Sequence, residues 1–143
     1  MKKTILLLIA IVWSLTAVYS QTGEKKPFRA YLVNNEYEVF LNIDFHEQCI
    51  TVPGQELYGE LPGYLGKKNN TFCWVITSAK IKDDKTAELS LINDYGSEDL
   101  TALLIRQNDS VYVLKQLDGS ALKVPKNGKW QKLPKTLELS TKR

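Results

Sequence analysis

The segment YEVFLNIDFH, residues 37–46, indicates the fold class more strongly than any other part of the chain. Its odd-numbered positions are Tyr, Val, Leu, Ile and Phe, whereas the positions between them are polar except for Phe40. Because successive side chains of a strand point to opposite faces, an apolar residue at every second position is typical of a strand with one buried face. The segment therefore predicts a half-buried β-strand.

Similar patterns recur on both sides of this segment. Residues 28–33 form a predicted strand that the turn Asn34-Asn35-Glu36 joins to it, and later strands are separated by other turn-forming clusters. Asn127-Gly128 is the strongest of these turn signals, because an Asn-Gly dipeptide favours a two-residue hairpin loop. The remaining predicted strands comprise residues 72–81, 86–92, 100–105, 111–114, 122–124, 130–133 and 136–139.

No segment after residue 20 has the periodicity of an amphipathic helix, and strands joined by short turns usually pair with their neighbours. The expected fold is all-β: a single small domain whose antiparallel meander forms a barrel or a strongly curved sheet, with a β-sandwich as the alternative. A barrel is favoured because closure removes the two exposed sheet edges. The strand succession is similar to that of lipocalin-like small barrels, but the N-terminal Gly-x-Trp of lipocalins is missing, so the similarity concerns the fold alone.

The segment 53–66 departs from this meander. It contains four glycines and two prolines, and yet also two tyrosines and three leucines. Flexible linkers lack such apolar residues, and a loop that carries aromatic side chains is often packed on the domain or exposed for binding. The alternative is a bent pair of strands in which the glycines mark bulges at a barrel corner.

Residues 1–20 are a predicted signal peptide. Two lysines precede a short apolar run, and Val18 and Ser20 occupy the small-residue positions of a cleavage site. The run is shorter than the about 20 apolar residues of a transmembrane helix, so we expect an exported protein, periplasmic or extracellular, with no membrane span after cleavage. Residues 21–27 are expected to form a flexible segment and residues 28–143 a single β-rich domain.

Cys49 and Cys73 are the only cysteines. An even number of cysteines in an exported protein favours a disulfide, and two cysteines allow one pairing. This bridge would close a loop of about 24 residues and stabilise the fold by roughly 3 kcal/mol in the chain-entropy model. The alternative is a pair of buried thiols in strands.

The charge of the chain argues against nucleic-acid binding. The formal net charge is +3 and falls to +1 without the two lysines of the leader, so the positive field of a nucleic-acid-binding domain is lacking. Residues 21–105 carry 8 basic and 13 acidic side chains, whereas residues 106–143 carry 9 basic and 3 acidic ones. This asymmetry indicates either a dipolar surface that steers a charged partner or oppositely charged strands that alternate in space.

No motif for catalysis, a metal ion or a cofactor stands out. Residues 93–99 bring carboxylates, an amide and a hydroxyl into one turn, which suits either calcium or a simple turn capped by Asp94 and Ser97. His46, the only histidine, shares a strand face with Asp44, but no serine lies in a Gly-x-Ser-x-Gly elbow to complete a triad. We therefore expect a solvated surface histidine, no metal site and no cofactor.

Three tyrosines are the first candidate binding residues. Tyr58, Tyr64 and Tyr95 are expected to line the mouth of a barrel, where aromatic side chains suit a small molecule or a glycan.

A second candidate site lies in the segment KNGKWQKLPK, residues 126–135. Lys129, Trp130 and Lys132 are its central residues, and a stacking ring among cations suits an acidic, sugar-like or anionic ligand. The alternative is an edge hairpin whose lysines protect it from aggregation.

These features favour an exported, non-catalytic binding protein that recognises a small molecule or a glycan outside the cytoplasm. The alternative is a protein-binding module such as an inhibitor or an immunity protein, and an enzyme is the third hypothesis. An interior pocket on the order of several hundred Å³ would favour ligand binding, whereas a filled interior would favour protein recognition.

Overall fold

The computed structural model describes residues 26–141, which form strands and one short 3-10 helix. The predicted signal peptide, its cleavage site and residues 21–25 lie outside the described residues. No helix within residues 26–141 is both long and apolar enough to cross a membrane. The elements are β1 (Arg29–Asn34), β2 (Val39–Asp44), β3 (Ile50–Thr51), η1 (Glu56–Tyr58), β4 (Glu60–Leu61), β5 (Gly63–Lys67), β6 (Cys73–Ile81), β7 (Thr86–Asn93), β8 (Asp99–Arg106), β9 (Val111–Gly119), β10 (Lys123–Lys126), β11 (Lys129–Lys132) and β12 (Thr136–Thr141).

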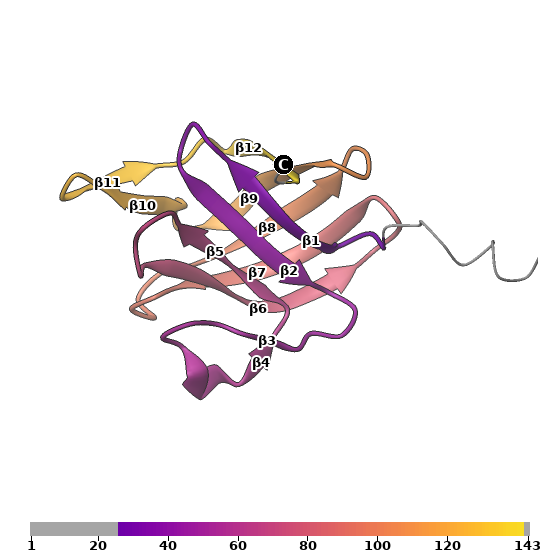
Figure 1. Cartoon of the computed structure of the whole chain (residues 1–143), viewed down its shortest axis with the longest axis horizontal. Coiled ribbons are helices and arrows are strands. Elements are labelled where there is room, and N and C mark those ends of the chain that lie inside the picture. Colours follow the sequence, from indigo (N-terminus) through magenta and orange to yellow (C-terminus); the bar gives the residue numbers. More distant parts are fainter. Residues whose placement is uncertain (1–25, 142–143) are drawn as a thin grey trace, which may run out of the picture.

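Eight strands form a closed antiparallel barrel in the order β1-β12-β9-β8-β7-β6-β5-β2, and β2 pairs with β1 to complete the circle (Figure 1). Each barrel strand pairs with the next barrel strand along the chain, as expected of a meander. Two hairpins, β3–β4 and β10–β11, leave the barrel and form small sheets of their own. The predicted all-β barrel is confirmed, and the sandwich alternative is wrong because the sheet closes on itself.

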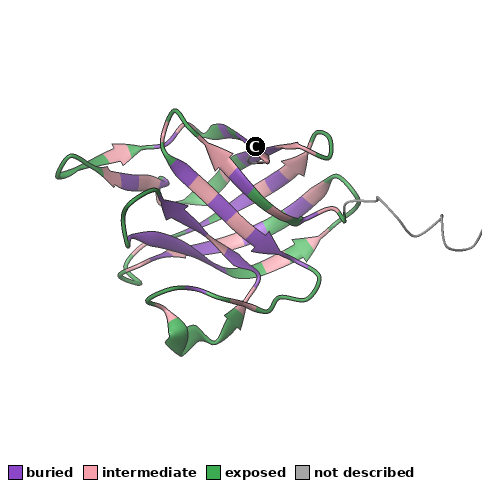
Figure 2. Ribbon diagram, in the orientation of Figure 1, coloured by how far each residue is buried: buried purple, intermediate pink, exposed green. Residues whose placement is uncertain are grey.

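The period-two pattern of residues 37–46 becomes the alternation of β2. Val39, Leu41 and Ile43 are at most 2% exposed and face the barrel interior, while Phe40 and Asn42 lie on the outer face. Figure 2 shows buried and less buried residues alternating along the barrel strands. The interior is filled with side chains, because the inward residues of all eight strands join one hydrophobic cluster.

A β-bulge keeps the apolar residues of β6 on the inner face. Trp74 and Ile76 face the core, and the register against β7 shifts directly after Ile76, where Thr77 is the extra residue. Ala79 and Ile81 pack against the core after the shift. In a regular strand without this bulge both would point outward, because strand side chains alternate.

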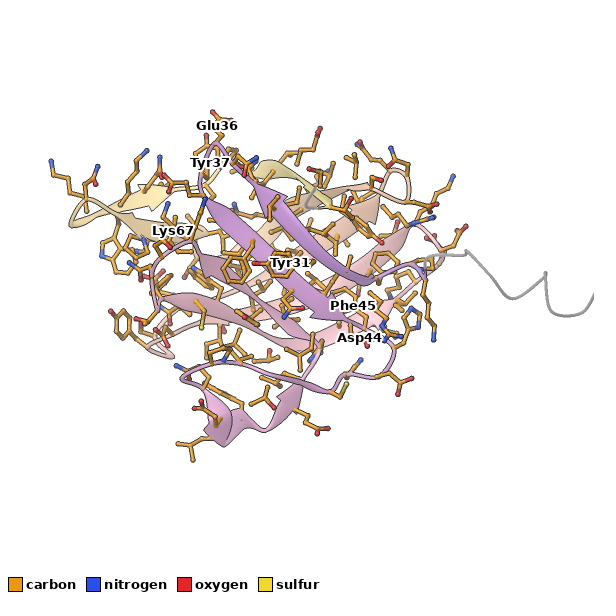
Figure 3. The ribbon with its side chains drawn as sticks, viewed as in Figure 1. Tyr31, Glu36, Tyr37, Asp44, Phe45 and Lys67 are labelled. Carbon is orange, nitrogen blue, oxygen red and sulfur yellow. The ribbon has the colours of Figure 1, made fainter. Side chains whose placement is uncertain are left out.

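The turn between β1 and β2 is tied to β5. Lys67 is 7% exposed, and its ammonium group donates a hydrogen bond of 2.7 Å to the carbonyl oxygen of Tyr37. The side-chain oxygen of Asn34 accepts a hydrogen bond of 2.9 Å from the backbone N–H of Tyr37. Figure 3 shows Lys67 near Tyr37, at the opposite end of β2 from Asp44 and Phe45.

Aromatic rings close one end of the barrel. Phe28 stacks on Phe45 with ring centroids 5.8 Å apart, and Tyr112 meets Phe28 edge-on at 5.7 Å. The Tyr112 hydroxyl accepts a hydrogen bond of 2.9 Å from the backbone N–H of Phe28. These contacts anchor the chain where it enters β1.

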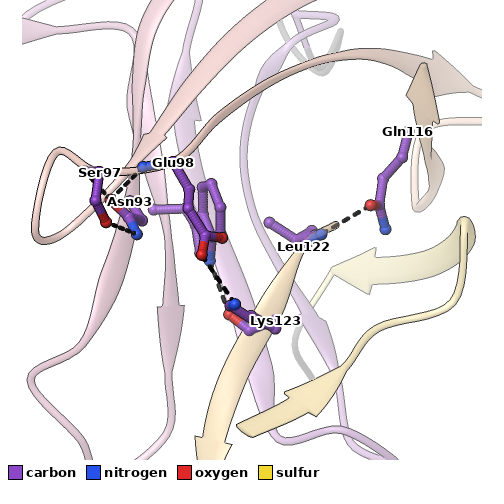
Figure 4. Close-up of polar contacts among 7 residues, drawn as sticks. Asn93, Ser97, Glu98, Gln116, Leu122 and Lys123 are labelled. Carbon is purple, nitrogen blue, oxygen red and sulfur yellow. Dashed lines mark hydrogen bonds and ion pairs between the residues drawn. The ribbon is translucent and has the colours of Figure 1, made fainter. Parts of the chain in front are cut away.

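The segment that leads into the β10–β11 hairpin closes the opposite end. Leu122 is completely buried, and its backbone N–H donates a hydrogen bond of 2.9 Å to Oε1 of Gln116. The indole N–H of Trp74 donates to the carbonyl oxygen of Lys123 at 2.8 Å. The ammonium group of Lys123 also pairs with Glu98 at 2.9 Å (Figure 4). The hairpin base is therefore part of the core, and the mouth of the barrel is closed.

The predicted disulfide is wrong, because Cys49 and Cys73 are both free thiols. Cys49 is exposed before β3, whereas Cys73 is 4% exposed at the start of β6. The side chain of Cys73 packs with Val52 and Val75 in a small second cluster, against which Leu61 of β4 also lies. Cys73 thus faces apolar neighbours under the β3–β4 hairpin, and only this cysteine matches the alternative of a buried thiol.

The position of Leu122 gives a stability prediction. Leu122→Ala removes atoms from a filled site, so the free energy of unfolding should fall by about 2–5 kcal/mol. Lys126→Ala, at the exposed tip of the same hairpin, should change this free energy by less than about 0.5 kcal/mol. Urea denaturation followed by tryptophan fluorescence measures both changes. Equal midpoints for the two variants would show that the hairpin does not close the barrel.

The two thiols should differ in reactivity. Burial raises the pKa of the Cys73 thiol to about 11, and the nearby Asp94 carboxylate adds to this effect. Because the thiolate is the reactive form, iodoacetamide at mildly alkaline pH should modify the exposed Cys49 of the folded protein and leave Cys73 intact. In urea without reductant both thiols should react, and mass spectrometry counts the added groups. A chain that takes up no reagent in urea would contradict the free thiols.

Candidate functional site

Two adjoining surface pockets lie where the turn between β5 and β6 meets the β3–β4 and β10–β11 hairpins. Their volumes are about 450 Å³ and about 340 Å³. Asn70, Thr71, Phe72 and Asp94 line both pockets, so the two form one continuous groove. We call it the aromatic groove after the rings that line it: Phe40, Tyr64, Phe72, Tyr95 and Trp130.

The first pocket is built on the outer face of β2 and β5. Phe40 pairs with Gly66 across these strands, and a Cβ atom added to Gly66 would lie 2.3 Å from the Phe40 ring. Glycine is therefore needed for the ring to lie against the sheet. Tyr64 meets Phe40 edge-on with ring centroids 5.7 Å apart. Pro53 and Gly54, from the loop after β3, complete the lining of this pocket.

The second pocket is centred on Phe72, which is 5% exposed. Its ring centroid lies 6.1 Å from that of Tyr95 and 5.1 Å from that of Trp130. Tyr95 is 73% exposed and Trp130 is 51% exposed, so both rings offer free surface to a ligand. The ammonium group of Lys123 lies 5.7 Å from the Trp130 ring centroid, and this cation–π contact helps to hold the indole in place.

The predicted Asn127-Gly128 hairpin turn is confirmed and presents this side of the groove. Asn127 and Gly128 have φ angles of 52° and 75°, and Lys126 pairs with Lys129 across the turn. Positive φ at both central residues is the geometry for which Asn-Gly is favoured. Gly128, Lys129 and the adjacent Trp130 consequently line the second pocket.

The acidic turn after β7 is organised by an amide. Oδ1 of Asn93 accepts hydrogen bonds from the backbone N–H groups of Ser97 at 2.9 Å and Glu98 at 3.2 Å. Its Nδ2 donates to the Ser97 hydroxyl at 3.1 Å (Figure 4). Asn93 thus performs the capping expected of Asp94, whose carboxylate instead accepts a hydrogen bond from the side chain of Gln55. Within residues 26–141, no three His, Cys, Asp or Glu side chains cluster as metal ligands.

Most of the groove lining is uncharged. Burial raises the pKa values of Tyr64 and Cys73, so the hydroxyl and the thiol keep their protons near neutral pH. Among the described residues that line the groove, the charged side chains are Asp94 and Lys129, one of each sign. The groove lining therefore offers ring faces and neutral hydrogen-bonding groups, with one charged side chain of each sign among them.

The structure brings together four of the residues predicted to bind a ligand. Tyr64, Tyr95, Lys129 and Trp130 line the aromatic groove. Tyr58 in η1 and Lys132 in β11 line neither of its pockets. The three tyrosines also do not surround an open barrel mouth, because core side chains fill the barrel. Their role in binding stays a prediction.

Sequence reasoning missed several residues of the groove. Phe40 carried a usable signal, because it is the one apolar side chain on the polar face of its strand. Phe72 carried none, since an aromatic residue at the start of a predicted strand resembles any core residue. Asn70 and Thr71 belong to a short turn, and only the folded chain places this turn beside Asp94.

His46 lies on the surface, as expected. Its side chain is exposed, and Nε2 lies 2.6 Å from the carbonyl oxygen of Pro27. The Asp44 carboxylate accepts hydrogen bonds from the backbone N–H groups of His46 and Glu47 and pairs with Arg29 at 3.6 Å. Burial acts to raise the pKa of Asp44, but these contacts outweigh it and lower the pKa. Asp44 therefore caps the turn after β2.

Comparisons with protein-family models, curated proteins and solved structures find no match to this chain. The function must therefore be inferred from the groove itself.

Proposed function

We propose that this is an exported, non-catalytic binding protein whose aromatic groove holds a neutral glycan. The supporting observation is the set of partly exposed rings, Tyr64, Tyr95 and Trp130, in a groove that also contains amide and hydroxyl groups. Flat rings pack against the apolar faces of sugar rings, and convergent polar groups bond to sugar hydroxyls. Binding sites combine these two kinds of contact to obtain affinity and orientation.

The balance of charge supports a ligand without net charge. Asp94 and Lys129 contribute one charge of each sign to the groove lining, so the lining itself does not select a charged ligand. The Tyr64 hydroxyl, which stays protonated, can donate and accept hydrogen bonds with a neutral partner.

The position of the groove supports binding on the outer surface. A lipocalin-like ligand would need an interior cavity, and here the interior is occupied by core side chains. The leader pattern of residues 1–20 supports exposure of this surface to periplasmic or extracellular glycans.

The proposal predicts that the exposed rings carry the affinity. Trp130→Ala and Tyr95→Ala should each weaken binding about tenfold or more, or by about 1.4 kcal/mol, because each change removes a ring face that the ligand covers. The Tm of both variants should stay close to the wild-type value, since at least half of each side chain is exposed. An array of neutral glycans identifies the ligand, and calorimetry with the strongest binder gives the Kd.

Tyr58→Ala is the matched control, because Tyr58 is also exposed but lies outside the groove. It should bind like the wild type. The proposal fails if no neutral glycan binds, or if both ring variants keep full affinity.

A protein partner is the second candidate function, and the filled barrel favours it because recognition is then confined to the surface. The β10–β11 hairpin projects from the end of the barrel (Figure 1) and carries the exposed Lys126, Lys129 and Lys132 around Trp130. A basic hairpin of this kind suits an acidic cleft on an inhibited or neutralised partner.

Charge reversal tests this second function. Lys129→Glu combined with Lys132→Glu should abolish binding to such a partner and leave the Tm nearly unchanged, because exposed lysines contribute little to folding. A pull-down with the mature protein from envelope extract supplies the partner, and its affinity is measured at low and at physiological salt. Unchanged affinity in both conditions would mean that the lysines only protect an edge.

A further inference from the structure

The aromatic groove continues past Phe40 into a third surface pocket of about 530 Å³. Phe40 lines both this pocket and the first pocket of the groove. Tyr31 and Val33 of β1 supply its other apolar surface on the outer face. Its polar lining includes Asn34, Asn35, Glu38, Lys68 and Ser140.

The strand registers align the pockets across the barrel. Val33 pairs with Ser140 of β12 and with Phe40 of β2, Phe40 pairs with Gly66 of β5, and Gly66 pairs with Cys73 of β6. These residues form a row of neighbours that runs perpendicular to the strands. Because neighbouring strands lie about 4.8 Å apart, the four steps of this row span about 19 Å. The row is thus longer than one sugar ring.

The ring of Phe40 lines both the third pocket and the first pocket of the groove. It occupies the space directly over Gly66, where even a Cβ atom would collide with it, and so it lies low on the sheet. Tyr31 stacks beside it at a centroid distance of 5.3 Å and an interplanar angle of 18°. Tyr31 is 44% exposed, and Figure 3 shows it in the middle of the outer face formed by β1 and β2. We call the surface of the three pockets together, from Trp130 through Phe40 to Tyr31, the track. Tyr31 therefore offers an exposed ring face at the end of the track away from Trp130.

The third pocket has the same electrostatic character as the rest of the track. Glu38 and Lys68 line it with one charge of each sign, and the amides and hydroxyls around them are neutral. A ligand that crosses all three pockets would therefore meet balanced charge along its whole length.

The direction of the track favours a glycan over a peptide. An extended peptide gains affinity by pairing its backbone with a free strand edge. Here the track runs across strands β1, β2 and β5, whose backbone groups already pair with their neighbours in the barrel. A glycan needs only ring faces and side-chain hydrogen bonds, which this surface supplies.

We infer that the track binds a linear, neutral oligosaccharide that lies across the strands from β6 to β12 and occupies several sugar subsites in succession. The inference rests on the proposed function and extends it to the length and direction of the ligand. A disaccharide fills part of the aromatic groove, whereas a longer chain also covers Tyr31 in the third pocket.

The inference is tested by how the affinity depends on the length of the oligosaccharide. Cello-, xylo-, malto- and chito-oligosaccharides are titrated into the mature protein as disaccharides and as hexasaccharides. In the series that binds, the hexasaccharide should bind about tenfold or more tightly than the disaccharide. Tyr31→Ala should cost about tenfold in hexasaccharide affinity and leave disaccharide affinity within about twofold, because of the three pockets Tyr31 lines only the third. Phe40→Ala should weaken both lengths, because Phe40 also lines the first pocket of the groove.

Controls separate this inference from the proposed function. Trp130→Ala should weaken both lengths, and Tyr58→Ala should weaken neither. Circular dichroism and Tm establish that each variant is folded, and the exposed position of Tyr31 makes a loss of stability in Tyr31→Ala small. If the disaccharide and the hexasaccharide bind with equal affinity and Tyr31→Ala changes neither affinity, the extended track is overturned, whereas the proposed glycan site in the aromatic groove is not. Absence of binding at every length overturns both.

Discussion

The pairing of β1 with β12 is the constraint on which the rest of the structure depends. Within residues 26–141 these strands share two residue pairs, Leu32 with Thr141 and Val33 with Ser140. The Asn34 side chain adds a hydrogen bond of 2.9 Å to the carbonyl oxygen of Glu138. This contact closes nearly the whole chain into one loop and so carries a large closure entropy, but it removes both edges of the sheet. It also brings Val33 and Ser140 side by side, which begins the row of residues under the proposed ligand.

The two hairpins outside the barrel solve problems that a barrel alone leaves open. The β3–β4 hairpin covers the outer apolar face at Cys73 and Val75, and the base of β10–β11 fills the mouth with Leu122 and its neighbours. The aromatic groove is lined by Pro53 and Gly54 of the loop after β3 and by residues of the β10–β11 hairpin, so it depends on how these segments cover the barrel.

The filled barrel interior and the aromatic residues on its outer face together confine a candidate binding site to the surface. Core side chains leave no room for a lipocalin-like ligand, while Phe40, Tyr64 and Phe72 form a nearly continuous apolar floor on the outside. Polar groups from short turns border this floor. The neutral glycan proposed as ligand rests on this surface, and the protein partner proposed as the alternative rests on the basic hairpin beside it.

Local patterns in the sequence determined most of the barrel strands and their turns, whereas the barrel strand β5 begins within the segment 53–66, for which a loop or a bent pair of strands was expected. The alternation in residues 37–46 and the Asn127-Gly128 turn depend only on neighbouring residues, and β7 matches its predicted range to within one residue. β9 runs on to Gly119, because pairing with β8 continues where the apolar pattern has ended. The state of the cysteines and the groove could not be foreseen in the same way. They depend on which segments become neighbours in space, and this was decided by barrel register and by the two covering hairpins, through contacts between residues far apart in the chain.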